Sequence, residues 1–175
     1  MPISQVGKPE SREWVLYVSA RTDYALRAML VLASRHPELV KGAALASSQE
    51  IPHPFLSGIL LDLRRADLVD SLRGTDGGYR LTRSPEEIRV GDVLRATVGA
   101  ITAVRGLPVA ATSYQGVASG LSEVWRSVHR AVEEVVDRAS LADLLRGGFA
   151  DDAEQQVSPA TTHRAPARRR RMETP

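Results

Sequence analysis

Hydrophobic and polar positions along the chain follow two different periods between about residue 17 and residue 98. Apolar residues recur every three or four positions over residues 17–36 and again over 54–66, which predicts two amphipathic helices. A shorter helix is expected at 41–48. Ser19 is suited to cap the first helix, and Pro52 and Pro54 mark a turn before the last one, whose apolar stripe includes Phe55.

The next segment changes to strand-like alternation. Residues 68–73 and 79–82 alternate, and the stretch between them is rich in glycine, which predicts a β-hairpin with a tight tip. A short helix is expected over 90–98, with Gly99 ending it. The expected fold class is therefore mainly α with a small β-hairpin wing, a winged helix-turn-helix domain over residues 16–99.

Residues 100–120 have no period and are expected to form a loop, long enough to be a candidate effector or partner site. A long amphipathic helix follows, and Ser140 is suited to cap one last turn after it. Its apolar face is larger than a small domain needs, so we expect a dimerisation segment over 121–146. For Trp125 a dimer core is favoured over a ligand platform. The residues expected at the dimer contact are Leu121, Val124, Trp125, Val128, Val132 and Val135.

The two ends of the chain are polar and contain proline. Residues 1–15 are expected to be a disordered leader and residues 147–175 a disordered basic tail, which includes four consecutive arginines at 168–171. The arginines could give sequence-blind affinity for nucleic acid, or serve only for solvation.

Composition excludes several classes of protein. The 175 residues suit one domain with accessory elements, and a net charge of +2 says little about partners. The chain has no cysteine, and its four histidines are scattered, so neither a metal site, a cofactor nor an enzyme is expected. No apolar run is long enough to span a membrane or to form a signal peptide, so we expect a cytoplasmic protein without membrane partners.

Four segments resemble, in order, the Rrf-type family of winged helix-turn-helix transcriptional regulators. LYVSARTDYALRAM at 16–29 resembles the opening helix, and IPHPFLSGIL at 51–60 resembles the entry to the recognition helix. Residues 63–69 with 73–79 are similar to the helix end and wing, and 88–96 to the segment after the wing. The order of these motifs is more specific than any one of them, and the resemblance covers residues 17–145.

The resemblance implies a set of DNA-contacting residues. His53, Pro54 and Ser57 would meet base edges and Arg64 would lie nearer the phosphates, whereas His53 could instead be an ordinary exposed turn residue. Arg73 resembles the arginine that the family inserts in the minor groove. Ser47 and Gln49 could position a phosphate, or could simply be polar residues at a helix end. For Gly74, as for Gly77 and Gly78, turn geometry is favoured over a contact with a ligand. The candidate DNA-contacting residues taken together are Ser47, Gln49, His53, Pro54, Ser57, Arg64, Arg73, Gly74 and Tyr79.

One departure from the family concerns sensing. Many relatives bind an iron-sulfur cluster through cysteines in the loop that corresponds here to residues 100–115, and this chain has no cysteine. Asp23 stands where some relatives have a carboxylate ligand, and without thiolates we expect it to be a surface or capping charge. The better comparison is with cluster-free members, which respond to a small molecule or a partner protein.

The function expected from these features is sequence-specific binding to double-stranded DNA as a homodimer, with repression of transcription as the usual outcome in the family. The alternative is an adaptor that keeps the winged fold and docks a partner protein through the 100–120 loop.

Overall fold

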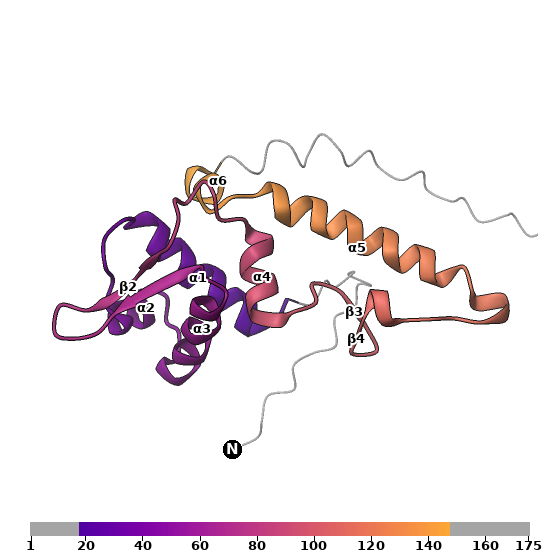
Figure 1. The fold of residues 1–175 in the computed structure, drawn as a ribbon, viewed down its shortest axis with the longest axis horizontal. Helices are drawn as coiled ribbons and strands as arrows, with labels where there is room; N and C mark the ends of the chain where they lie inside the picture. Colours follow the sequence, from indigo (N-terminus) through magenta and orange to yellow (C-terminus); the bar gives the residue numbers. More distant parts are fainter. Residues whose placement is uncertain (1–17, 148–175) are drawn as a thin grey trace, which may run out of the picture.

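The computed structural model describes residues 18–147, and in it the winged unit has the expected order of elements (Figure 1). Three helices are followed by an antiparallel hairpin and a fourth helix. Their bounds are α1 (Ala20–Ser34), α2 (Gly42–Ser48), α3 (His53–Arg65), β1 (Val69–Leu72), β2 (Gly78–Leu81) and α4 (Val90–Val98).

The hydrophobic core lies where α1 crosses α3 and α4 and is closed by the wing. α1 contributes Met29 and Leu32, α3 contributes Ile59 and Leu63, and α4 contributes Val93, all of them fully buried. Because the buried residues of α1 and α3 recur every three or four positions, each of these two helices has one face in the core and one in solvent. The period of the sequence thus determined which face is buried.

Local signals set the ends of the elements. The Ser19 side chain accepts a hydrogen bond from the Thr22 N–H, which caps α1 as expected. Gly99 follows α4 with a φ of 76°, a conformation that favours glycine. In the wing, Val69 pairs with Leu81 and Leu72 pairs with Gly78. These features confirm a mainly helical fold with a small hairpin wing.

Residues 100–120 are more structured than the expected loop. They contain a two-residue hairpin, β3 (Ala103–Val104) with β4 (Leu107–Pro108), and two single turns of 3-10 helix, η1 (Val109–Ala111) and η2 (Gly116–Ala118). Arg105 and Gly106 form the turn with φ values of 54° and 78°. The short hairpin was not expected, because strands of two residues show no alternation in the sequence and Arg105 adopts a backbone conformation that arginine seldom does.

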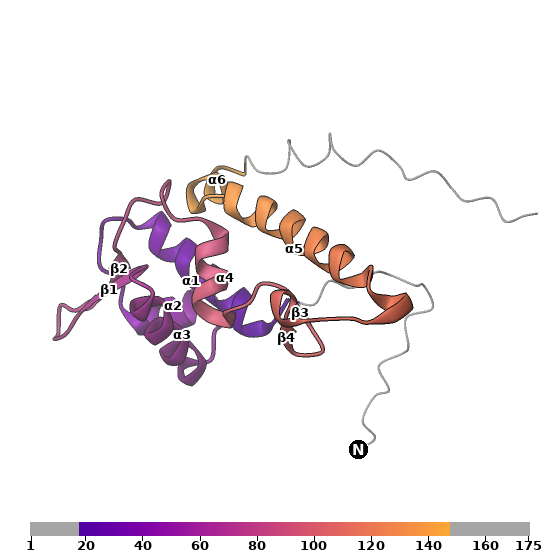
Figure 2. The same ribbon diagram turned by 45° about the vertical axis from the view of Figure 1, so that its right-hand side comes forward.

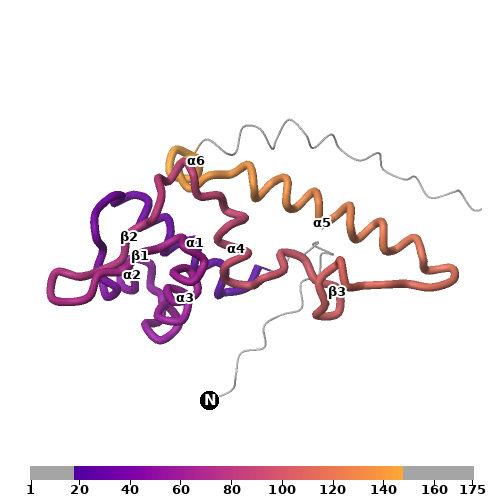
Figure 3. The backbone as a smooth tube through the Cα atoms, in the orientation of Figure 1, coloured from indigo at the N-terminus to yellow at the C-terminus, as the bar shows by residue number. Residues whose placement is uncertain are grey.

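The long helix α5 (Leu121–Arg138) extends away from the winged unit and returns to it only at its C-terminal end (Figures 1 and 2). There the Val90 N–H donates to the Ala139 carbonyl at 2.9 Å, and the Leu141 N–H donates to the Ile88 carbonyl at 3.0 Å. A separate short helix, α6 (Leu141–Arg146), begins at the Ser140 cap. The tube in Figure 3 shows residues 111–120 running out to the far end from which α5 starts.

The expected leader at 1–15 and all but the first residue of the expected tail at 147–175, its arginines included, lie outside the described residues. Between residues 18 and 147, no helix combines the length and the apolar character that crossing a membrane requires.

Candidate nucleic-acid interface

The sharp turn between α2 and α3 sets the angle of a helix-turn-helix. Glu50 takes a positive φ of 52°, and the Ile51 N–H donates to the Ala46 carbonyl at 2.9 Å. Pro52 then precedes α3, and its carbonyl accepts from the Leu56 N–H. This turn brings the end of α2 beside the first turn of α3.

The first turn of α3 presents the expected base-contacting residues to solvent. His53, Pro54 and Ser57 are all exposed, and the Ser57 hydroxyl donates to the His53 carbonyl at 3.1 Å. The helix begins at His53, one residue earlier than expected, because a proline in the first turn has no N–H that the helix would need. Exposed side chains at a helix N-terminus are what major-groove readout requires.

Ser47 and Gln49 lie beside this turn with different surroundings. Ser47 is exposed, and its hydroxyl donates to the Ala43 carbonyl at 2.9 Å. Gln49 is half-buried at the end of α2, and its carbonyl accepts from the Arg27 guanidinium at 3.2 Å. Arg27 therefore ties α1 to the turn that positions α3.

The tip of the wing carries Arg73. Gly74 has a φ of 110°, and the Gly77 N–H donates to the Gly74 carbonyl at 3.0 Å, closing the tip. A Cβ on Gly77 would lie 2.2 Å from the Leu72 carbonyl oxygen, so only glycine fits there. The glycines thus fold the wing back directly after Arg73, which is left exposed at the tip.

Tyr79 lies at the base of the wing, away from the tip. Its N–H and carbonyl exchange hydrogen bonds with Val40 at 2.9 and 2.8 Å, and its half-buried ring packs over Gly42. The described contacts of Tyr79 attach the wing to the segment before α2.

Arg64 lies near the opposite end of α3 from His53. It is exposed and lines an open hollow of about 460 Å³ together with His36, Asp70 and Arg80. Eleven residues of helix place Arg64 about 16 Å from His53 along the axis of α3. The structure therefore separates Arg64 from the first-turn residues and places it beside the wing strands.

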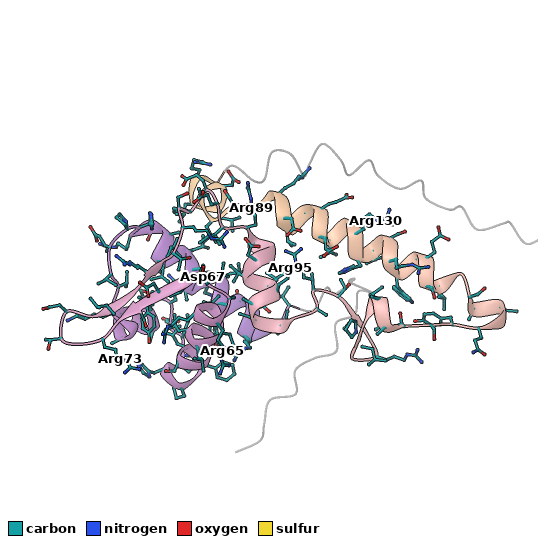
Figure 4. The ribbon with its side chains drawn as sticks, viewed as in Figure 1. Arg65, Asp67, Arg73, Arg89, Arg95 and Arg130 are labelled. Carbon is teal, nitrogen blue, oxygen red and sulfur yellow. The ribbon has the colours of Figure 1, made fainter. Side chains whose placement is uncertain are left out.

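Charge pairing distinguishes the cations of this surface. Arg80 pairs with Asp70 at 3.3 Å and Arg65 with Asp62 at 3.6 Å. Within residues 18–147, no carboxylate lies within ion-pair distance of Arg64 or Arg73. Figure 4 shows Arg73 on the wing and Arg65 on α3 at the same lower-left side of the molecule. Cations without an internal partner are available to phosphates.

Phe55 is a feature that the hydrophobic pattern misplaced. The period assigned it to the buried stripe of α3, but its side chain is 49% exposed in the first turn, beside Pro54. The core side of this turn is filled by Leu56 alone. Periodicity gives the angle of a residue around a helix, and it cannot show that the neighbouring element stops short of covering it.

The face expected to form a dimer contact is incompletely covered. α5 contributes no residue to the core, and its large apolar side chains at 121, 124, 128 and 135 are 41–51% exposed. Trp125 and Val132 are half-buried toward the rest of the chain. An apolar stripe this long on a single helix is typical of an interaction surface.

Comparison with known proteins identifies the family to which the chain belongs. The family model Rrf2, described as an iron-dependent transcriptional regulator, matches residues 18–147, which is most of the chain. The chain belongs to the Rrf2 family. The resemblance inferred from the sequence motifs is thereby confirmed.

Individual relatives agree with this assignment. Rv1287 of Mycobacterium tuberculosis, a candidate HTH-type transcriptional regulator, is 38% identical over 139 residues, covering 79% of this chain and 86% of its own. The solved structure of CymR, described as the global cysteine regulator of Bacillus subtilis, matches with a TM-score of 0.64 at 30% identity, over 76% of this chain and 98% of that one. T. potens IscR matches with a TM-score of 0.61 at 32% identity, over 83% and 94%.

These relatives are named as transcriptional regulators and not as enzymes, so the expectation of a non-catalytic protein is confirmed. DNA-binding regulation is accordingly the general function of this Rrf2 family member.

The residues of this chain do not fit an iron-sulfur cluster. The sequence contains no cysteine, so no thiolate is available at residues 100–115 or elsewhere. In the described part of the chain, no three His, Asp or Glu side chains come together as a metal site would need. Asp23 is engaged instead with Arg27, one turn further along α1.

Proposed function

We propose that this chain is a sequence-specific, cluster-independent repressor that binds a two-fold related operator as a homodimer. A regulator of this kind works on chromosomal DNA, so we place it in the cytoplasm. The proposal assigns direct contact with DNA to Ser47, Gln49, His53, Pro54, Ser57, Arg64, Arg73, Gly74 and Tyr79.

The observation that carries the proposal is the placement of Arg73. It stands at the tip of a hairpin that glycines fold tightly, and no described carboxylate pairs with it. A guanidinium in such a position suits the narrow minor groove, where negative potential is concentrated. The exposed first turn of α3 then suits the neighbouring major groove.

Association through α5 explains why its stripe is exposed. Two copies that bury Leu121, Val124, Val128 and Val135 against each other would remove most of that apolar surface from water. Trp125 and Val132 would lie at the margin of the contact. A two-fold dimer would present its two α3 helices about 34 Å apart, or one turn of DNA.

Selection from a pool of random DNA duplexes, at near-physiological salt, tests the proposal. The full-length wild-type protein should enrich a two-fold related motif, and Arg73→Ala should weaken binding by about 1–3 kcal/mol and relax the preference at one step of each half-site. The matched control is Arg64→Ala, which should weaken binding to selected and unselected DNA alike, because a phosphate contact carries no sequence information. Equal effects of both variants on all DNA would contradict this division of roles.

An adaptor that docks a protein through residues 100–120 is the other outcome of this experiment. It predicts no enriched motif and, for any residual binding to DNA, the same affinity for every sequence. Salt gives an independent criterion, because a protein that contacts six to ten phosphates loses about 10³–10⁵ in affinity between 50 and 200 mM salt.

A further inference from the structure

The exposed ring of Phe55 lies in the part of α3 that is proposed to enter the major groove. It belongs to the same turn as His53 and Pro54, and about half of its surface is open. Single exposed apolar residues are common on protein surfaces and need no explanation by themselves. The surroundings of this ring distinguish it from such residues.

Phe55 is held in place from one side by aromatic packing. Its ring meets the Tyr24 ring edge to face, with centroids 6.1 Å apart and planes at 82°. The Arg27 guanidinium lies 5.4 Å from the centroid of Tyr24, and the same guanidinium donates to the Gln49 carbonyl. Such contacts fix the orientation of the ring before any ligand arrives, so little side-chain entropy is lost on binding.

One chemical feature of the major groove is apolar. The 5-methyl group of thymine projects into the groove and distinguishes a T·A pair from the other three by contact with an apolar side chain, phenylalanine included. The polar groups of bases require hydrogen-bonding partners, which a phenyl ring lacks.

We infer that Phe55 is a specificity-determining residue that recognises a thymine methyl group in each half of the operator. The inference rests on the proposed function, because it requires the first turn of α3 to enter the groove. It adds an apolar contact to a set of DNA-contacting residues that otherwise acts mainly through polar side chains and Arg73.

Deoxyuridine tests the inference directly, since it differs from thymidine in the base only by the missing methyl group. The probe is the duplex motif selected by the wild-type protein, with each thymine position replaced in turn by deoxyuridine in both half-sites. At one position the replacement should weaken wild-type binding about three- to fivefold for each methyl group removed. In Phe55→Ala the same replacement should change affinity by less than about twofold, because the methyl then has no partner.

Leu61→Ala is the matched control, since Leu61 is also an exposed apolar residue of α3 but lies beyond its first turns. This variant should keep the full deoxyuridine penalty. The deoxyuridine replacements are measured first with the wild-type protein, so a folding defect in Phe55→Ala would not affect that measurement. A motif without thymine, a motif that tolerates every replacement, or an unchanged penalty in Phe55→Ala overturns the inference while the proposed function stands. If the wild-type protein selects no motif at all, the proposed function fails and the inference fails with it.

Discussion

The winged unit and the α5 segment are built from the same kinds of residue but are completed in different ways. Helices α1, α3 and α4 bury their apolar faces against one another, and even the short α6 contributes the fully buried Leu141. α5 has an equally regular apolar stripe, yet none of its residues is buried. A periodic stripe therefore predicts a helix with a face to cover, and only the structure shows whether the chain covers that face itself.

The largest expected effect is the loss of stability when a core residue of the winged unit is truncated. Leu63→Ala should lower the free energy of unfolding by about 2–5 kcal/mol, because the Leu63 side chain of α3 is fully buried in the hydrophobic core. The control is Leu61→Ala on the same helix, which should cost less than about 1 kcal/mol because Leu61 is exposed. Denaturant titration at one fixed protein concentration gives both values. Equal costs would show that α3 does not bury the face assigned to it.

The second prediction concerns the exposed stripe of α5. Val128→Asp would bury a carboxylate without a partner in a two-fold contact, so the dimer should weaken by about 2–3 kcal/mol or more. Circular dichroism should stay close to that of wild type, since α5 supplies nothing to the core. Sedimentation over a range of concentrations measures the change. Arg126→Ala, an exposed polar position on α5, should associate like wild type, and a loss of association in both variants would count against this face.

A structural feature could be predicted from the sequence where residues close together in the chain determine it. The Ser19 cap, the faces of α1 and α3 and the glycine-rich wing follow from local rules, and the structure agrees with them. The hairpin at 103–108 escaped prediction because its strands are too short to show alternation. Phe55 was misplaced because its exposure depends on how completely other elements pack against the first turn of α3, which is a tertiary property.

Contacts between residues far apart in the chain also could not be predicted from the sequence. Arg95 on α4 donates two hydrogen bonds to Asp137 on α5, at 2.8 and 2.6 Å, across 42 residues of sequence. Figure 4 shows Arg95 directed from α4 toward α5. These bonds hold the pKa of the Asp137 carboxyl below its ordinary value and raise the pKa of the Arg95 guanidinium above its ordinary value. The pattern of hydrophobic and polar residues does not predict which arginine will pair with which aspartate.

The third prediction measures this link between the two regions. A double-mutant cycle with Arg95→Ala and Asp137→Ala should give a coupling of less than about 1 kcal/mol, because both side chains are open to solvent, 39% and 43% exposed. Added salt should reduce the coupling further. A coupling well above 1 kcal/mol at physiological salt would mean that the pair is shielded by something other than the chain itself.

The smallest expected effect is at the start of α6, where α5 rejoins the winged unit. Hydrogen bonds from the Ser140 hydroxyl and N–H, with a further bond from Arg146, lower the pKa of Asp143 to about 2 from an ordinary value of 3.8. Because the folded pKa is lower than the unfolded one, the stabilisation is complete above pH 3.8 and is lost as the pH falls toward about 2.

Asp143→Asn should therefore remove part of the acid sensitivity. Unfolding curves collected from pH 5 to pH 2 should converge for the variant and the wild type as the pH falls. Identical pH dependence in the two proteins would show that Asp143 does not stabilise the fold through its charge.

The central claim is that two copies meet through α5 and present two winged units to one operator. Native mass spectrometry of the full-length protein with its selected duplex, at a protein concentration near the dissociation constant, tests this claim most directly. The account predicts that the bound species carries two 19.0 kDa chains and that Val128→Asp shifts it toward one chain with weaker binding. A complex with a single chain on a motif without two-fold symmetry, unchanged by Val128→Asp, would contradict it.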